Sequence, residues 1–372
     1  MNPAKKIKQS LLIAGLFLIS VPSVSFAEEE NNGIKLQYKI GDGLYIGNDD
    51  HSVHLQGRVQ TRFTYTLLES NPDTATFSIP RGEIRIDGYT LHKKLKFAFE
   101  MNLATRNNAS GIATLNDYYI DWVPTPLIGI QIGQFKAPFL FQQLTSSTKL
   151  QFVDRPLATG FFDFGRDIGI NVHGSVLNKK LNYSVFAMNG DGPNSFNRNN
   201  RALLAGARLE VPILGEYKYS EGDVDYSENI NFGMGAAYAF NESSSALQAS
   251  TIAAFTKAHH GTVDAGFKYK GFSLQGAGMV TRSAEGASIT NWGFNAQAGY
   301  FIIPKKFELV AKAGAGFFDG AAVNQFEYAG GLNYYFKGHG IKLQADYSFL
   351  KNDGGVSGVN DHRIRAAMNF IF

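Results

Sequence analysis

The feature that most limits the fold of this 372-residue chain is a period-two alternation of apolar and polar residues that runs almost from end to end. In residues 53–67, for example, Leu55 and Val59 fall on one face, and Gln60 and Arg62 fall on the other. Successive side chains of a β-strand point to opposite faces, so this pattern predicts strands with one apolar and one polar face. Its repetition from segment to segment predicts an all-β chain.

The apolar face is rich in aromatic residues, as in Trp292, Phe294 and Tyr300 on one segment and Tyr328 and Tyr334 on another. The opposite positions carry small, amide or charged residues, and short turns alternate with longer polar loops along the chain. A soluble sandwich would bury its apolar face against a second sheet. A barrel in a membrane points that face at lipid and keeps a polar lumen, with short turns at one end and long loops at the other. We therefore predict a transmembrane antiparallel β-barrel.

The number of strands follows from the direction of the chain. With residues 246–257 taken as a strand the count is seventeen, and strand directions counted from the two ends disagree. Bacterial single-chain barrels have even strand numbers, so we predict sixteen strands. Residues 241–260 are then an extracellular loop with room to fold inward, and residues 213–228 form an unusually long periplasmic turn.

The first residues predict export. Residues 1–27 contain a basic start, an apolar run and a small-residue exit, which are the three parts of a secretory signal peptide. This segment takes three of the 35 basic residues, which leaves 32 and equals the 32 acidic residues. A nearly neutral mature chain gives no reason to expect a nucleic-acid partner. The sequence contains no cysteine, so disulfide bonds do not stabilise it.

The domain organisation follows from these boundaries. We expect a periplasmic lead-in at residues 28–52 and one barrel at residues 53–372, with no linker between domains. The final residue, Phe372, is preceded by apolar residues at every second position. That ending is similar to the C-terminal signal of outer-membrane barrels, so the expected location is the bacterial outer membrane, and its lipid is an expected partner.

A series of sequence blocks lies in order within residues 53–192. The blocks are Leu55-Gln-Gly-Arg-Val-Gln60, Phe77-Ser-Ile-Pro-Arg-Gly-Glu-Ile-Arg85, Asp117-Tyr-Tyr-Ile-Asp121, Gly133-Gln-Phe-Lys-Ala-Pro-Phe139, Leu144-Thr-Ser-Ser147, Arg155, Gly165-Arg-Asp-Ile-Gly169 and Ala187-Met-Asn-Gly-Asp-Gly192. Together they resemble the phosphate-selective porin O and P family. The resemblance implies a sixteen-stranded homotrimeric porin whose third loop, residues 136–165 here, folds inward and constricts the lumen.

The same resemblance implies a set of constriction residues. Members of the family use a serine pair, a nearby lysine and a downstream arginine on the third loop, together with arginines on the first two strands. The matching residues in this chain are Ser146, Ser147, Arg155, Arg58 and Arg81. Two positions depart from the pattern, because Gln143 stands where the lysine is expected and Pro80 stands where the first arginine of a pair is expected. The loss of two cations weakens the expectation of tight phosphate selectivity.

Strand parity adds candidates of its own. Arginines at inward positions of two neighbouring segments predict a cationic patch on the wall, namely Arg58, Arg62, Arg81 and Arg85. Arginine presents a planar fork that suits phosphate or carboxylate, and the hydroxyls of Ser146 and Ser147 can add hydrogen bonds. The alternative is that these arginines pair with inward acids and only stabilise the wall, the acids being Glu83, Asp87, Glu100, Asp117 and Asp121.

Taken together, the sequence predicts a porin for passive diffusion of small polar solutes, in particular anions such as phosphate. Two alternatives stay open: a general diffusion porin without phosphate selectivity, and a plugged barrel with a surface adhesion or recognition role. The doublet His259-His260 has no ligand spacing for a metal, and no catalytic triad is recognisable. We therefore expect no metal, no cofactor and no enzymatic activity.

Overall fold

The computed structural model describes residues 33–104, 113–195, 203–242, 257–286, 288–319, 323–353 and 359–372. The predicted signal peptide, residues 1–27, lies outside these residues. No helix in the described ranges is long and apolar enough to cross a membrane.

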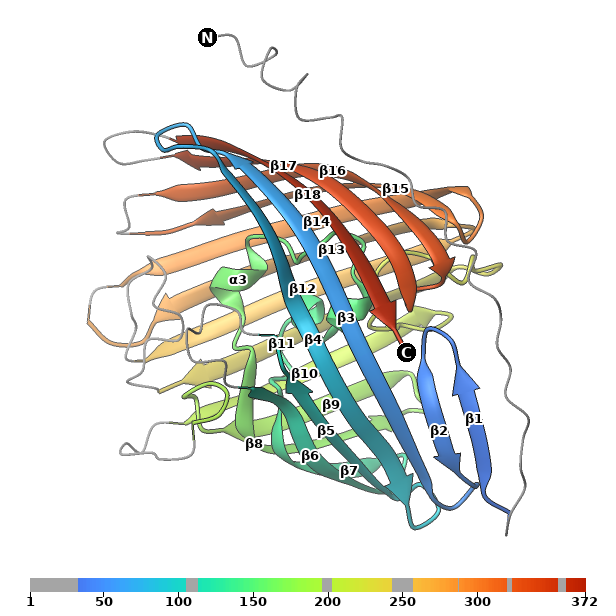
Figure 1. Cartoon of the computed structure of the whole chain (residues 1–372). Coiled ribbons are helices and arrows are strands. Elements are labelled where there is room, and N and C mark those ends of the chain that lie inside the picture. Colours follow the sequence, from blue (N-terminus) through green and yellow to red (C-terminus); the bar gives the residue numbers. More distant parts are fainter. Residues whose placement is uncertain are drawn as a thin grey trace.

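Sixteen antiparallel strands form a closed barrel, because the last strand, β18, pairs with the first barrel strand, β3 (Figure 1). Each of the other strands pairs with its neighbours in sequence, so the chain winds up and down around the wall. The barrel strands are β3 (Ser52–Leu67), β4 (Thr74–Thr90), β5 (Leu95–Asn102), β6 (Thr114–Thr125), β7 (Ile128–Lys136), β8 (Arg166–Val176), β9 (Leu181–Met188), β10 (Leu204–Leu214), β11 (Asn231–Asn241), β12 (Ala258–Tyr269), β13 (Phe272–Ser283), β14 (Thr290–Ile303), β15 (Phe307–Phe317), β16 (Asn324–Lys337), β17 (Ile341–Asp353) and β18 (Val359–Ile371).

The predicted strand number is confirmed, and three predicted boundaries are corrected. Strand β12 begins at Ala258, so residues 258–260 are part of the wall and not of the loop predicted at 241–260; residues 243–256 of that loop lie outside the described residues. The long periplasmic turn spans residues 215–230, because the alternation carries β10 on to Leu214. The third loop spans residues 137–165, because Lys136 still pairs with Arg166 across the ladder.

The predicted lead-in contains a hairpin. Strands β1 (Lys35–Lys39) and β2 (Gly43–Gly47) pair with each other, and β2 also pairs with the start of β3. The hairpin thus extends the wall beyond the end of β18, beside the C-terminus (Figure 1). Phe372 closes the barrel there by exchanging two main-chain hydrogen bonds with Gly57 (2.7 and 2.9 Å). A Cβ on Gly57 would lie 2.5 Å from the Phe372 ring, so a larger residue at this position would displace the final aromatic ring.

The two faces of the wall have the predicted characters. Trp292 and Tyr328 point outward and are about half exposed (48% and 51%), whereas Gln60 and Asn295 point inward and are buried. Trp292 also stacks on Phe317 on the outer face, with ring centroids 4.0 Å apart. Exposing a large apolar side chain to water costs about 1.5–3 kcal/mol relative to burial, so an outer surface covered with such residues requires lipid around it.

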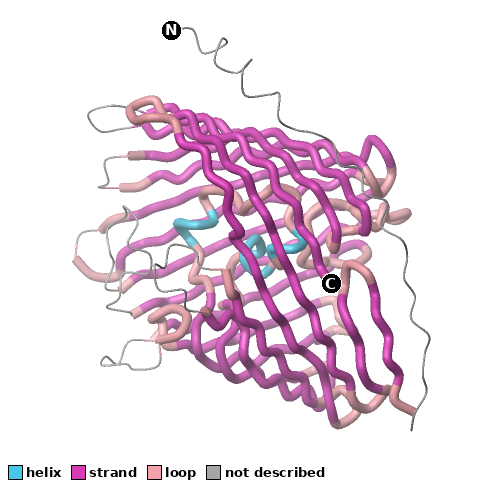
Figure 2. Tube along the Cα trace, in the orientation of Figure 1, coloured by secondary structure: helices cyan, strands magenta, loops and turns pink. Residues whose placement is uncertain are grey.

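Residues 137–165, hereafter the constriction loop, lie inside the barrel (Figure 2). The loop contains three short helical turns, α2 (Phe141–Leu144), η1 (Ser147–Lys149) and α3 (Thr159–Phe162). Its aromatic residues pack in an apolar cluster with the inner wall, formed by Phe135, Phe139, Phe162, Phe164, Phe186, Met188, Leu204, Met279 and Phe318 among others. This cluster buries apolar residues of the loop against the inner wall and so helps to hold the loop inside the barrel.

Candidate functional site: the constriction of the lumen

Gln151 is the central anchor of the constriction loop. Its side-chain amide donates to Ser273 Oγ (2.9 Å) and to Glu308 Oε1 (2.7 Å) and accepts from Gln297 (3.0 Å). Its main-chain carbonyl accepts from Asn333 (2.8 Å). Gln344 on β17 also donates to this carbonyl (2.9 Å), so the partners come from β13 to β17 and one loop residue is joined to five strands of the wall. Buried polar groups that are fully hydrogen-bonded fix a segment in a single position.

Main-chain donors of the loop continue this attachment. The N–H of Val153 donates to Asp346 (3.0 Å) on β17, and the N–H of Leu157 donates to Glu327 (2.8 Å) on β16. Hydrogen bonds to a carboxylate are shorter and stronger than those between neutral groups. The loop is therefore attached to the wall from β13 to β17, and β18 alone separates this part of the wall from β3 and β4, the strands that carry most of the predicted arginines.

Asp154, near the middle of the loop, is shared by two of those arginines. Arg62 and Arg81 each place a guanidinium nitrogen 3.3 Å from its carboxylate. Although burial opposes ionisation, the guanidinium groups of Arg81, Arg365, Arg155 and Arg62 hold the pKa of Asp154 well below its usual range. We call these five residues the Asp154 cluster. Loop and wall charges meet there.

The backbone of β4 explains why Arg81 reaches this point. The pairing of β3 with β4 shifts between Gln60, which faces Arg81, and Arg62, which faces Ser78. The irregularity contains Pro80, which has no N–H to give to a ladder. The proline that departs from the family pattern thus marks a β-bulge, and such bulges re-aim neighbouring side chains. Arg81 also donates to the Gln60 side chain.

Arg155 is engaged with the loop itself. Its guanidinium donates to the main-chain carbonyls of Gln142 (2.7 Å) and Thr145 (2.7 Å), which closes the segment between them. Burial lowers the pKa of Arg155, and neighbouring Asp163 and Asp154 oppose that shift. The carbonyl partners are uncharged, so the positive charge of Arg155 adds to the Asp154 cluster.

The other arginine of the first strand, Arg58, is only 3% exposed. It donates to Glu83 (2.9 Å), to Ser147 Oγ (2.7 Å) and to Asn369 (2.9 Å). This arrangement places Arg58 between the loop and the wall. Ser146 precedes Ser147 in the loop and does not share this role. Its Oγ caps the following turn and contacts Thr148 Oγ1 (2.9 Å).

Arg85 lies in a second group of charges, which we call the Arg85 cluster. Its guanidinium contacts Asp87 (2.8 Å), Glu100 (3.0 Å) and Asp117 (3.4 Å). Arg166, which opens β8, also contacts Asp117 (2.7 Å) and Glu100 (3.4 Å). Three carboxylates thus face two guanidinium groups in this cluster. This is the alternative given in the sequence analysis, in which inward arginines pair with inward acids of the wall.

Three further cations near the constriction were not singled out by the sequence analysis as pore-lining residues. Arg365 bonds Asp346 through two nitrogens (2.7 and 2.9 Å), and its inward position follows from the alternation Arg363-Ile-Arg365. Lys136 donates to two carbonyls of the loop, so its position at the end of β7 anchors the loop. Lys149 is exposed and forms no ion pair with the described residues. No sequence signal marks it, because η1 is a local turn.

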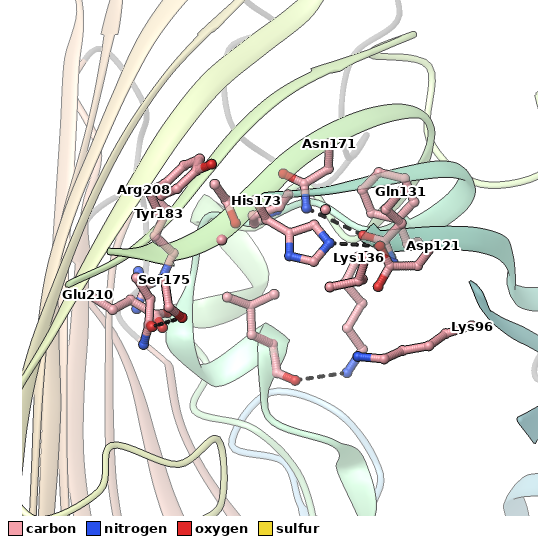
Figure 3. Close-up of a pocket in the computed structure, with 18 of the residues that line it drawn as sticks. Lys96, Asp121, Gln131, Lys136, Asn171, His173, Ser175, Tyr183, Arg208 and Glu210 are labelled. Carbon is pink, nitrogen blue, oxygen red and sulfur yellow. Dashed lines mark hydrogen bonds and ion pairs between the residues drawn. The ribbon is translucent and has the colours of Figure 1, made fainter. Parts of the chain in front are cut away.

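A cavity of about 520 Å³ opens beside the loop, toward the periplasmic ends of β5 to β10 (Figure 3). Lys96, His173 and Tyr183 are among its lining residues, and His173 lies 2.8 Å from Asp121. The cavity reaches Lys136 and Leu144 at the base of the loop.

A closed sixteen-stranded barrel with an apolar exterior, a polar lumen and a loop that narrows it is the architecture of an outer-membrane porin. The chain belongs to the phosphate-selective porin O and P family, whose model matches residues 53–372. The family resemblance of residues 53–192 is thereby confirmed and extends to the end of the barrel. The protein is a porin of the bacterial outer membrane, and proteins of this family and fold are channels rather than enzymes.

Solved structures show the same fold at low sequence identity. The outer membrane channel DcaP of Acinetobacter baumannii is 15% identical, with a TM-score of 0.60 over 87% of this chain and 98% of that one. The anion-selective porin from Comamonas acidovorans is 13% identical, with a TM-score of 0.60 over 87% and 100% of the two chains. OprB of Pseudomonas putida is 9% identical, with a TM-score of 0.64 over 86% and 94%. No curated protein sequence matches the chain significantly.

Proposed function

We propose that this porin prefers small anions, phosphate among them, and that the Asp154 cluster selects them. The observation that carries the proposal is the environment of Asp154. One loop carboxylate is shared by Arg62 and Arg81, and Arg155 adds a charge that is bonded only to neutral carbonyls. The side chains of Arg62 and Arg81 are partly exposed (17% and 12%), so water and solute reach them.

The energetic argument is electrostatic. Two unit charges 4 Å apart interact by about 1 kcal/mol in bulk water and by more near a low-dielectric wall. An excess of guanidinium over carboxylate at the narrowest level therefore attracts anions and repels cations. Arg fits phosphate oxygens through paired N–H groups, which favours oxyanions over halides at the same charge.

The test is the reversal potential of the purified porin in a planar bilayer under a KCl gradient. We expect the sign of an anion-selective channel and a partial block of chloride current by added phosphate. A cation-selective current would contradict the role of the Asp154 cluster. A folded barrel without conductance would instead favour a plugged barrel.

The runner-up function is a general diffusion porin without phosphate selectivity. The Arg85 cluster favours it, because its three carboxylates offset Arg85 and Arg166. The absence of the family lysine at Gln143 points the same way. Anion current that is indifferent to phosphate would favour this function over phosphate selection.

We also propose a homotrimer embedded in outer-membrane lipid. Support comes from the family and from the trimer form of Vibrio cholerae OmpT, which shares the fold with a TM-score of 0.60 at 10% identity. The mass of the detergent-solubilised protein, measured with the detergent contribution removed, tests this. A mass equal to one chain would contradict the trimer.

A further inference from the structure

Residues 215–230, which join β10 to β11 at the periplasmic end, are much longer than the other periplasmic turns, such as 91–94 or 304–306. We call them the periplasmic insert. A long polar turn at this end has no need to contact the barrel. Glu221, Gly222 and Asp223 are nevertheless buried, and Glu221 is 1% exposed. The middle of the insert therefore lies within the lumen.

The first half of the insert is attached to the inner wall. The hydroxyl of Tyr217 donates to Asp264 on β12, and the hydroxyl of Tyr219 accepts from Arg208 on β10 (3.2 Å). Both tyrosine rings also contact Phe141 of the constriction loop, with ring centroids 5.3 Å away in each case. Insert, wall and loop thus share one aromatic contact.

The centre of the insert contacts the constriction loop directly. A Glu221 carboxylate oxygen accepts from the main-chain N–H of Gln151 (2.6 Å), the residue that anchors the loop. The N–H of Glu221 donates to the carbonyl of Lys149 (3.0 Å). These two bonds bracket the loop segment that precedes Asp154, so the position of the Asp154 cluster depends on the insert.

Gly222 allows this approach. Its φ of +68° is a left-handed conformation that favours glycine, and a Cβ there would lie 2.9 Å from Glu308 Oε1. Asp223 then turns the chain back, because its carboxylate accepts from the N–H of Ser227 (2.9 Å) and from the N–H of Gly271 (2.7 Å). The insert is therefore an ordered segment whose turn is fixed by its own hydrogen bonds.

We propose that the periplasmic insert is a second constriction element. It holds the constriction loop from the periplasmic side and closes the periplasmic end of the lumen along β10 to β15. Glu221 is the positioning residue of this clamp. Solute that passes the Asp154 cluster then leaves through the cavity lined by β5 to β10. The proposal rests on the channel function of the barrel, and it assigns to this chain a role for a periplasmic turn in setting the pore.

Cross-linking tests the docked position. The chain contains no cysteine, so the double variant Lys149→Cys/Ser220→Cys introduces the only pair of thiols and leaves Glu221 in place. Because Lys149 shares a 3.0 Å main-chain hydrogen bond with Glu221, the residue next to Ser220, a short bifunctional thiol reagent should join the two cysteines within one chain of the folded protein. The matched pair Lys149→Cys/Glu216→Cys should cross-link much less, since Glu216 is exposed and pairs with Lys218. A folded Lys149→Cys/Ser220→Cys barrel that the reagent does not join would overturn the proposal.

Conductance tests the role. Replacing residues 217–227 by a short Gly-Ser turn removes the floor, so we expect conductance to rise about twofold, with more frequent current fluctuations as the loop loses its clamp. Glu221→Ala should reproduce the fluctuations, whereas Glu216→Gln should conduct as the unaltered porin does. Should the shortened barrel not fold, heat-modifiable migration in a gel will show it, and Glu221→Ala alone decides. Quiet, unchanged current in Glu221→Ala would refute the clamp while leaving the porin function intact.

Discussion

The Asp154 cluster and the Arg85 cluster differ in a way that strand parity does not show. Both contain arginines from inward positions of β4, and the sequence predicts the same cationic patch for both. Arg81 shares one loop carboxylate with Arg62, whereas Arg85 faces three carboxylates and shares two of them with Arg166. The difference arises because the loop delivers a single acid to Arg81, while the ladder places Glu100 directly across from Arg85. Cross-strand register, and not parity alone, decides how many carboxylates face each arginine.

The largest effect expected from this comparison concerns Arg81→Ala. Removing a charge at the constriction should lower the anion-to-cation permeability ratio about fivefold, which corresponds to about 1 kcal/mol. Arg155→Ala should act in the same direction, with extra current fluctuation because Gln142 and Thr145 lose their donor. Reversal potentials in a KCl gradient measure both.

Arg85→Ala is the matched control, because it lies on the same strand and has the same parity. Its charge is already offset by Asp87, Glu100 and Asp117, so we expect a clearly smaller change in selectivity than for Arg81→Ala. Equal losses in the two variants would show that the clusters act alike and that the comparison is wrong.

A second prediction concerns a substitution that should raise the anion-to-cation permeability ratio. Asp117→Asn removes one of the three carboxylates of the Arg85 cluster and leaves two carboxylates facing Arg85 and Arg166, so the net negative charge of the cluster is lost. The anion-to-cation permeability ratio should then rise, by about twofold because Glu100 still screens both arginines. A fall in that ratio would mean that Asp117 acts through the shape of the wall and not through its charge.

The third prediction separates loop attachment from charge. Ser147→Ala removes one of the three acceptors of buried Arg58, and an N–H left unsatisfied in a buried site costs about 1–3 kcal/mol. Ser146→Ala removes only a cap on a short turn, worth about 1 kcal/mol. Protease sensitivity of the loop in the folded barrel should therefore increase more in Ser147→Ala, while reversal potentials stay near the unaltered value. A shifted reversal potential in Ser147→Ala would instead indicate solute contact.

The wall was predictable because a sheet repeats one rule at every residue. Alternation gave the strands, their faces and their number, and Phe372 marked the closing strand. The contacts inside the lumen follow no such regular pattern. The contacts of Gln151 with five strands, and of Glu221 with Gln151, join residues far apart in sequence, and no periodicity predicts them.

The limits of the prediction are clearest in two segments. The sequence predicts residues 213–228 only as an unusually long periplasmic turn, because an inward-folded polar turn and a solvated one have the same composition. The arginines were placed on the correct face, yet parity says nothing about which acid sits opposite. Pro80 shows that a residue that departs from the family pattern can change the backbone, here at a β-bulge, where family members have a charge.

The smallest effect concerns pH and a carboxyl group at the end of the constriction loop. Burial raises the pKa of Asp163 to about 6, against the opposing pull of Arg155, Lys136 and Arg166. Because this pKa is above that of an exposed carboxyl, the loop loses stability as the pH rises through about 6, where Asp163 ionises. Acidification from pH 7 to pH 5 removes that negative charge next to Arg155, so anion preference should rise slightly and current fluctuation should fall. Asp163→Asn mimics the protonated group and should abolish its share of the pH step, measured as the difference in reversal potential between the two pH values. If the reversal potential of Asp163→Asn changed by the same amount between the two pH values, the pH dependence would come from other groups. Ionisation of Asp163 would then have no effect on anion preference.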